Sequence, residues 1–84
     1  MTREEIAARI KQFLIERHPR SDKTFTDTTD IIEDWLPDSL ALVEVVLFLE
    51  KTFGVQLAST DINHDAFKDV GTLAGLVEAR RPKR

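Results

Sequence analysis

The chain has 84 residues, no cysteine and a formal net charge of −3, which indicates one domain (1–84) without a disulfide framework, a thiolate metal site or a deep catalytic cleft. No secretory segment stands at the N-terminus and no apolar run approaches the roughly 20 residues of a membrane span, so we expect a cytoplasmic protein without membrane insertion. Eight acidic and only two basic side chains lie between Asp22 and Phe53, and this acidic centre argues against a nucleic-acid partner.

The first predicted element is an amphipathic helix over residues 3–17. Thr2 and Glu5 have the spacing of a capping box, in which each side chain bonds the backbone N–H of the other residue. Four apolar residues then share one helical face: Ile6, Ile10, Phe13 and Leu14. His18 precedes a proline, which ends the helix, and we expect a solvated imidazole there.

Residues 19–37 form a long polar connection, and loops of this length are often functional. Its apolar residues are expected to hold it against the core, with a helical turn near Asp30–Glu33. They are Phe25, Ile31, Ile32, Trp35 and Leu36. The neighbouring carboxylates of Glu33 and Asp34 have no further catalytic or metal-binding residue nearby, so we interpret them as solvated.

The central stretch, from Asp38 to Phe53, is predicted to be a helix. A buried strand is the competing interpretation, because several of its residues are β-branched, but sixteen residues are long for a strand. Asp38 or Ser39 can cap its first turn, and Gly54 suits its C-terminus. This helix is apolar nearly all round, and we divide it into two stripes. Leu42, Val46, Leu49 and Phe53 are assigned to the core, whereas Leu40, Val43 and Leu47 form a second stripe that needs another explanation.

The remainder predicts an extended segment over 54–57, a short helix from Asp61 to about Asp65, and a last helix over 70–80 capped by Asp69. Phe67 and Val70 are expected in the core, with Leu73, Leu76 and Val77 facing inward. His64 has no second histidine or cysteine at ligand spacing and is interpreted as a surface residue. Residues 79–84 are expected to form a basic, frayed tail. The predicted fold is all-α: a small four-helix bundle of three principal helices and one short helix, with a long first loop.

Ser39 is the candidate functional residue. At a helix N-terminus its hydroxyl lies beside unpaired N–H groups, which favour a phosphoester, although the same serine could simply be a cap. As a catalytic nucleophile it would need an activating base. Neither His18 nor His64 has a sequence context that suggests one, so the chain is not expected to be an enzyme.

The segment EDWLPDSLALVEVVLFLEKTFGV resembles the acyl carrier protein family around its modified serine. In that family an Asp-Ser-Leu opens the second helix, a glutamate follows five residues after the serine (Glu44), and the helix ends in Glu-x-x-Phe (Glu50 to Phe53). More weakly, the resemblance extends over nearly all of the chain. It implies a discrete carrier that holds acyl groups as thioesters on a covalent 4′-phosphopantetheine arm derived from coenzyme A.

The resemblance also assigns roles to residues. Ser39 would be the attachment residue and Asp38 its flanking acid. Four further residues would contact partner enzymes: Leu40, Val43, Glu44 and Leu47. The implied partners are a phosphopantetheinyl transferase and the enzymes that load and process acyl groups, and a monomer is expected.

The sequence departs from the family pattern before and within the central helix. Leu36 replaces the usual glycine two residues before Asp38, and Ala41 and Lys51 stand where carriers of fatty-acid synthesis commonly have acids. A specialised lipid or polyketide-type pathway is therefore the favoured interpretation, and an aminoacyl or peptidyl carrier is the alternative within the family. From another class, an unmodified helical interaction module with Ser39 as a plain cap is also open.

Overall fold

The computed structural model describes residues 2–81, and within them every regular element is helical. Three α-helices form the body: α1 (Arg3–Arg17), α2 (Ser39–Phe53) and α3 (Val70–Arg80). Two short turns complete it, the π-helical turn η1 (Ile31–Trp35) and the 3₁₀ turn η2 (Ser59–Asp61). The expected all-α bundle with a long first loop is confirmed, and no helix in the described part is long and apolar enough to cross a membrane.

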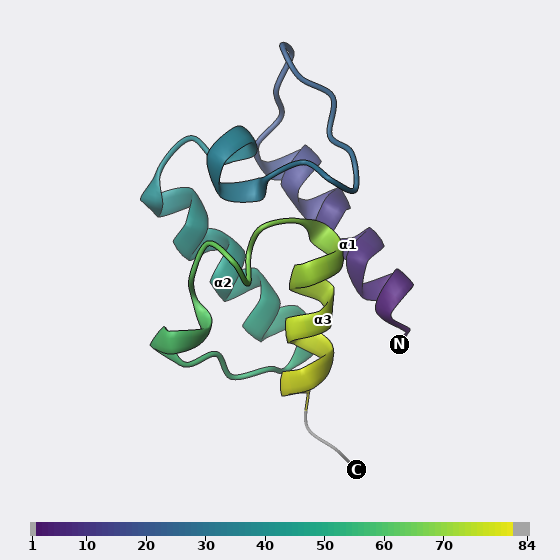
Figure 1. Ribbon diagram of the computed structural model, residues 1–84, viewed down its shortest axis with the longest axis vertical. Helices are drawn as coiled ribbons and strands as arrows, with labels where there is room; N and C mark the ends of the chain where they lie inside the picture. Colours follow the sequence, from purple (N-terminus) through teal and green to yellow (C-terminus); the bar gives the residue numbers. More distant parts are fainter. Residues whose placement is uncertain (1, 82–84) are drawn as a thin grey trace.

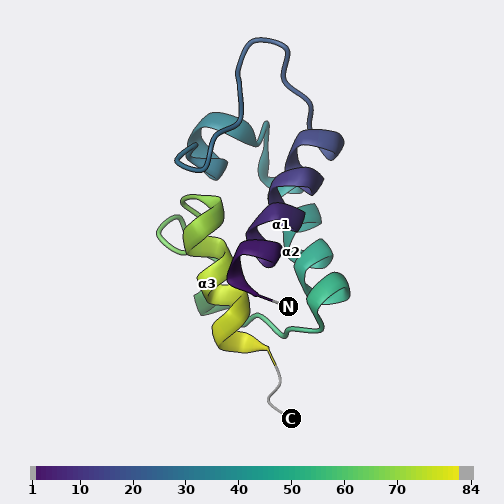
Figure 2. The ribbon, with the colours of Figure 1, turned by 90° about the vertical axis from the view of Figure 1, so that its right-hand side faces the viewer.

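The three long helices enclose one core, with α1 and α3 packed together and α2 behind them in the second view (Figures 1 and 2). α1 contributes Ile6, Ile10 and Leu14, all fully buried, and its capping box at Thr2 and Glu5 is present as predicted. α3 contributes Val70, Leu73, Ala74 and Val77.

Aspartates cap three of the helical segments. The Asp30 side chain accepts from the Glu33 N–H at 2.9 Å, and Asp69 accepts from the Thr72 N–H at 2.8 Å. Asp38 does the same for α2, at 2.9 Å from the Ala41 nitrogen. At the other end of α2, Gly54 adopts a φ of +68°, which glycine reaches without a Cβ penalty.

The long connection is held to the core by the residues that the sequence suggested. Phe25, Ile31, Trp35 and Leu36 are buried and Ile32 is partly buried. The Trp35 indole donates to the Leu14 carbonyl at 3.1 Å and meets the Phe25 ring edge-on. The Ile31 N–H bonds the Lys68 carbonyl at 2.8 Å, which joins η1 to the segment before α3. These contacts place η1 beside the start of α2 (Figure 1).

The division of α2 between core and surface differs from the prediction. The buried line is Ala41, Val45 and Leu49, while Leu42, Val46 and Phe53 pack only partly against the core. The prediction followed the +4, +3, +4 spacing of the apolar residues along α2. The helix instead turns Ala41 and Val45 inward, and the Phe48 ring stacks on Phe13 of α1 with the ring centroids 4.1 Å apart.

Two expectations for the C-terminal half are corrected. The short helix lies at Ser59–Asp61, earlier than the expected 61–65, and residues 64–67 form a separate turn whose Ala66 N–H bonds the Asn63 side chain. The frayed tail expected over 79–84 is wrong for its first two residues. Residues 79 and 80 belong to α3, and Arg80 pairs with Asp61 at 2.8 Å. Residues 82–84 lie outside the described range.

Candidate functional site

Ser39 is the first residue of α2 and is exposed. Asp38, not Ser39, supplies the capping oxygen, so the serine hydroxyl is not used for that purpose. Within residues 2–81 the Ser39 side chain makes no hydrogen bond. The arrangement therefore presents a free hydroxyl at the positive end of a fifteen-residue helix, where a phosphate ester is favoured.

A shallow hollow of about 220 Å³ opens beside this hydroxyl. Asp38 and Ser39 form its polar edge, and its apolar walls are Ile32, Leu36, Pro37 and Leu42. Two of these walls come from η1 and the residue that follows it, so the π-helical turn shapes the surroundings of Ser39. Sequence reasoning identified Ser39 and Asp38 but did not predict this hollow, because its walls come from segments that only the tertiary fold brings together.

Neither histidine hydrogen-bonds Ser39. His64 lies at the surface as expected, but its Nε2 is 2.8 Å from Asp30 Oδ2, a contact that the sequence did not suggest. Burial opposes ionisation of Asp30, yet the hydrogen bonds from the Glu33 N–H and from His64 together hold the pKa of this carboxyl below its ordinary value. His64 thus ties the α2–α3 connection to the cap of η1.

His18 departs from the expectation of a solvated imidazole. Its side chain is only 14% exposed, and its buried Nε2 lies 3.8 Å from Glu44 Oε1 without a hydrogen bond. The packing of the end of α1 against α2 covers the ring. Glu44 itself is bound by Arg17, whose Nη2 and Nε lie 2.6 and 2.8 Å from Oε2.

Leu40, Val43 and Leu47 are exposed, with 68%, 51% and 59% of their surfaces accessible. We call these three residues the apolar strip. They follow Ser39 along the outer side of α2, so the second stripe of the sequence lies outside the core. Glu44, which the resemblance grouped with them, turns instead to α1. Ala41 is buried at 1% exposure and is not part of the outer face of α2. Of Ala41 and Lys51, the two positions where fatty-acid carriers commonly have acids, only Lys51 therefore affects the charge of that face.

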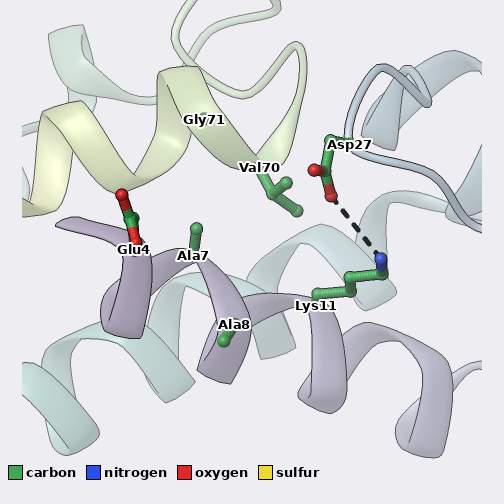
Figure 3. A pocket seen from close by; sticks show the side chains of 7 residues that line it. All are labelled: Glu4, Ala7, Ala8, Lys11, Asp27, Val70 and Gly71. Carbon is green, nitrogen blue, oxygen red and sulfur yellow. Dashed lines mark hydrogen bonds and ion pairs between the residues drawn. The ribbon is translucent and has the colours of Figure 1, made fainter.

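No group of three potential metal ligands occurs among residues 2–81. Glu33 and Asp34 are exposed, and Lys23 Nζ lies 3.9 Å from Asp34 Oδ1. A further hollow of about 460 Å³ lies between α1, the first loop and α3. Figure 3 shows Ala7 and Ala8 of α1 below Val70 of α3, with Lys11 and Asp27 paired beside them. Ser39 belongs neither to the Glu33–Asp34 pair nor to the lining of this hollow.

No protein-family model matches the chain. Among curated proteins, it is 29% identical over 79 residues to an acyl carrier protein of Thermotoga maritima, an alignment that covers 94% of this chain and 95% of the relative. It is 28% identical over 81 residues to an acyl carrier protein of Lactobacillus acidophilus, with 96% and 99% covered. Both alignments extend over nearly the whole of each protein, so they include α2 and Ser39.

Proposed function

Because this chain is similar over nearly its whole length to two acyl carrier proteins, we propose that it is a member of that family and that Ser39 carries a 4′-phosphopantetheine arm whose terminal thiol holds acyl intermediates as thioesters. The observation that carries the proposal is the free, exposed Ser39 hydroxyl at the N-terminus of α2, released from capping by Asp38. Carriers of this family have no catalytic activity of their own, and separate enzymes act on the attached group.

The modification is a phosphoryl-type transfer from coenzyme A. A new bond forms between Ser39 Oγ and the phosphorus that bears the pantetheine, and the bond from that phosphorus to the bridging oxygen of the pyrophosphate breaks. Adenosine 3′,5′-bisphosphate leaves with that oxygen, and the serine proton goes to a base of the transferase. The resulting phosphodiester stays beside the N–H groups of the first turn of α2, which stabilise negative charge. The hollow lined by Ile32, Leu36, Pro37 and Leu42 offers the arm an apolar resting surface.

The experiment is incubation with coenzyme A and a phosphopantetheinyl transferase of broad substrate range, followed by intact-mass measurement. Wild type should gain the mass of one phosphopantetheinyl group. Ser39→Ala should gain none while keeping the wild-type melting temperature, because the side chain is exposed and is not the cap. A wild type that several transferases leave unmodified would contradict the carrier function. Equal modification of wild type and Ser39→Ala would show that the arm attaches to another residue.

We further propose a specialised lipid or polyketide-type pathway for the cargo. Lys51, exposed near the end of α2, supports this proposal because it lowers the negative charge of the outer face. Loading assays of the modified protein with acyl and aminoacyl donors would test it. Efficient charging by an amino-acid-activating enzyme would favour the aminoacyl carrier instead.

A further inference from the structure

We propose that His64 is a positioning residue for the modification of Ser39: in its protonated form it holds η1, which lines the hollow beside the serine, against the segment that leads into α3. This tie is stronger in mildly acidic solution and weaker above neutral pH. The proposal rests on the carrier function above and adds a pH-dependent control of the same site.

η1 is the last helical turn before α2, and it supplies part of the wall beside the Ser39 hydroxyl. Ile32 of η1 and Leu36, which follows the turn, line the hollow of about 220 Å³ that Asp38 and Ser39 border. The Leu36 N–H bonds the Ile31 carbonyl at 2.8 Å and so closes the turn. A contact that fixes the start of η1 therefore also fixes the residues that lead to Ser39.

Two contacts fix the start of η1 to the segment between η2 and α3. One is a backbone bond, from the Ile31 N–H to the Lys68 carbonyl at 2.8 Å. The other joins His64 Nε2 to Asp30 Oδ2, also at 2.8 Å. The second oxygen of Asp30 accepts from the Glu33 N–H at 2.9 Å, so one carboxylate both caps η1 and binds the imidazole. Figure 1 shows η1 above this segment and beside the start of α2.

Of these two contacts, only the one to His64 changes with pH near neutrality. Burial opposes ionisation of Asp30, but the hydrogen bonds from the Glu33 N–H and from His64 hold the pKa of this carboxyl below its ordinary value of 3.8, so it stays ionised. Histidine ordinarily changes its charge between about pH 5 and 8. An imidazolium makes a charge-assisted bond to a carboxylate, roughly twice as strong as the bond from a neutral ring. The contact therefore stabilises η1 most in acid and loses part of this effect as the pH rises through that range.

The charged groups around the imidazole leave Asp30 as its partner. Among residues 2–81, Asp30 has the only carboxylate that pairs with the ring. The other charged residues next to the pair are Glu33 on η1 and Asp65 and Lys68 on the segment of the imidazole. All three are exposed and none forms an ion pair within that range. Two acids and one base add to the charge of Asp30, and this local balance favours the protonated ring.

Hydrogen exchange of the unmodified protein tests the tie directly. The Leu36 N–H closes η1, and NMR follows its exchange at about pH 6 and about pH 8.5, on either side of neutrality. In the acidic buffer His64→Gln should exchange this proton about threefold faster than wild type, because ion pairs of such exposure change an equilibrium by roughly 1.5- to 5-fold. In the basic buffer the two proteins should agree. The substitution is distant from Leu36 in the sequence, so it does not alter the intrinsic exchange rate of that amide.

Asp30→Asn separates the charge of the carboxylate from its capping bond. The amide oxygen still accepts the Glu33 N–H, because asparagine caps a helix as well as aspartate does, but the negative charge is gone. The variant should therefore match His64→Gln in the acidic buffer, and the two substitutions together should add nothing further.

Arg80→Gln is the matched control for the loss of an ion pair as such. The side chains of Arg80 and Asp61 are 44% and 12% exposed, close to the 45% and 20% of His64 and Asp30. Their pair joins η2 to α3 instead of reaching η1. The Leu36 N–H of this variant should exchange as in wild type in both buffers.

Competition measures the effect on Ser39. Wild type and His64→Gln are mixed in equal amounts with one transferase and coenzyme A, and intact masses show how fast each gains the phosphopantetheinyl group. The pH profile of the transferase cancels, because both proteins share the enzyme. The variant should be modified up to about threefold more slowly in the acidic buffer, since the enzyme must then order a looser η1, and equally fast in the basic buffer. Arg80→Gln should compete equally with wild type in both.

The outcomes separate this proposal from the carrier function. Unchanged exchange in His64→Gln overturns the tie, and so does equal acceleration by Arg80→Gln. Faster exchange with equal competition overturns the role in Ser39 modification and leaves the carrier function intact. A wild type that no transferase modifies overturns the carrier function, and the exchange measurement, which needs no transferase, then still decides whether His64 holds η1.

Discussion

At the scale of single residues, Arg80 and Asp61 show how one ion pair joins the end of α3 to η2. The guanidinium binds both carboxylate oxygens, with Nη2 2.8 Å from Oδ1 and Nε 3.2 Å from Oδ2, and the Ala58 N–H donates to Oδ2 at 3.0 Å. The Arg80 hydrogen bonds, followed by that of Ala58, hold the pKa of Asp61 below its ordinary value of 3.8.

This lowered pKa predicts a pH-dependent effect of Arg80→Gln. Because the folded protein binds the Asp61 proton less tightly than the unfolded chain, the pair stabilises the fold above pH 3.8 and loses this effect as the pH falls through the folded pKa. The variant should melt slightly below wild type at pH 7, and the difference should vanish at pH values well below 3.8. Melting curves across this range measure it. A difference that persists in acid would assign the effect to packing instead.

Which residue contacts could be predicted depends on their separation in the sequence. The caps at Thr2, Asp38 and Asp69 join residues three apart and followed from local spacing. The pairs Arg17–Glu44 and Asp30–His64 join residues 27 and 34 apart. No local pattern encodes them, because they exist only once the helices have packed. For that reason the exposed Ser39 was predictable, whereas the engagement of Glu44 was not.

At the scale of elements, α2 is an apolar helix with a buried side and an exposed apolar side. Its existence and both ends followed from Asp38 and Gly54, and the outward position of the apolar strip is also confirmed. The rotation of α2 about its own axis could not be predicted from the sequence. A helix that is apolar on most sides gives several equally good stripes, and in the folded protein Val45 is buried while Phe48 stacks on Phe13.

Two valines of α2 provide a matched test of this rotation. Val45 is fully buried and Val43 is 51% exposed. Val45→Ala should lower the free energy of unfolding by about 2 kcal/mol, because two methyl groups leave the core and a cavity remains. Val43→Ala should change it by less than about 0.5 kcal/mol. Urea titrations of both variants measure the difference, and equal destabilisation would show that the rotation of α2 described here is wrong.

At the scale of the whole molecule, the long connection behaves as part of the core. Phe25, Ile31, Trp35 and Leu36 are buried among residues of the long helices, and the indole of Trp35 bonds the backbone of α1. The apolar residues of the connection were sufficient to predict that it packs against the core. Its π-helical turn was not predicted in that form, because the bond from the Leu36 N–H to the Ile31 carbonyl depends on where Lys68 holds Ile31.

This packing predicts one cooperative unfolding transition. Trp35 is the single tryptophan of the chain, so its fluorescence reports on the connection alone, while far-ultraviolet circular dichroism reports mainly on the three long helices. The two signals should follow the same urea curve, as in a two-state domain. A fluorescence transition at clearly lower urea would mean that the connection detaches while the helices remain folded.

The small size of the apolar strip also limits how long any partner that docks on it would stay bound. Three side chains, each giving about 1.5–3 kcal/mol when fully buried, contribute roughly 5–9 kcal/mol, against roughly 4–15 kcal/mol of lost translational and rotational freedom. Such an interface gives weak complexes. With a dissociation constant of about 10 μM and an association rate constant of about 10⁶ M⁻¹ s⁻¹, the residence time is about 0.1 s. The carrier function proposed above requires such brief encounters, and the exposed face of α2 is small enough to permit them.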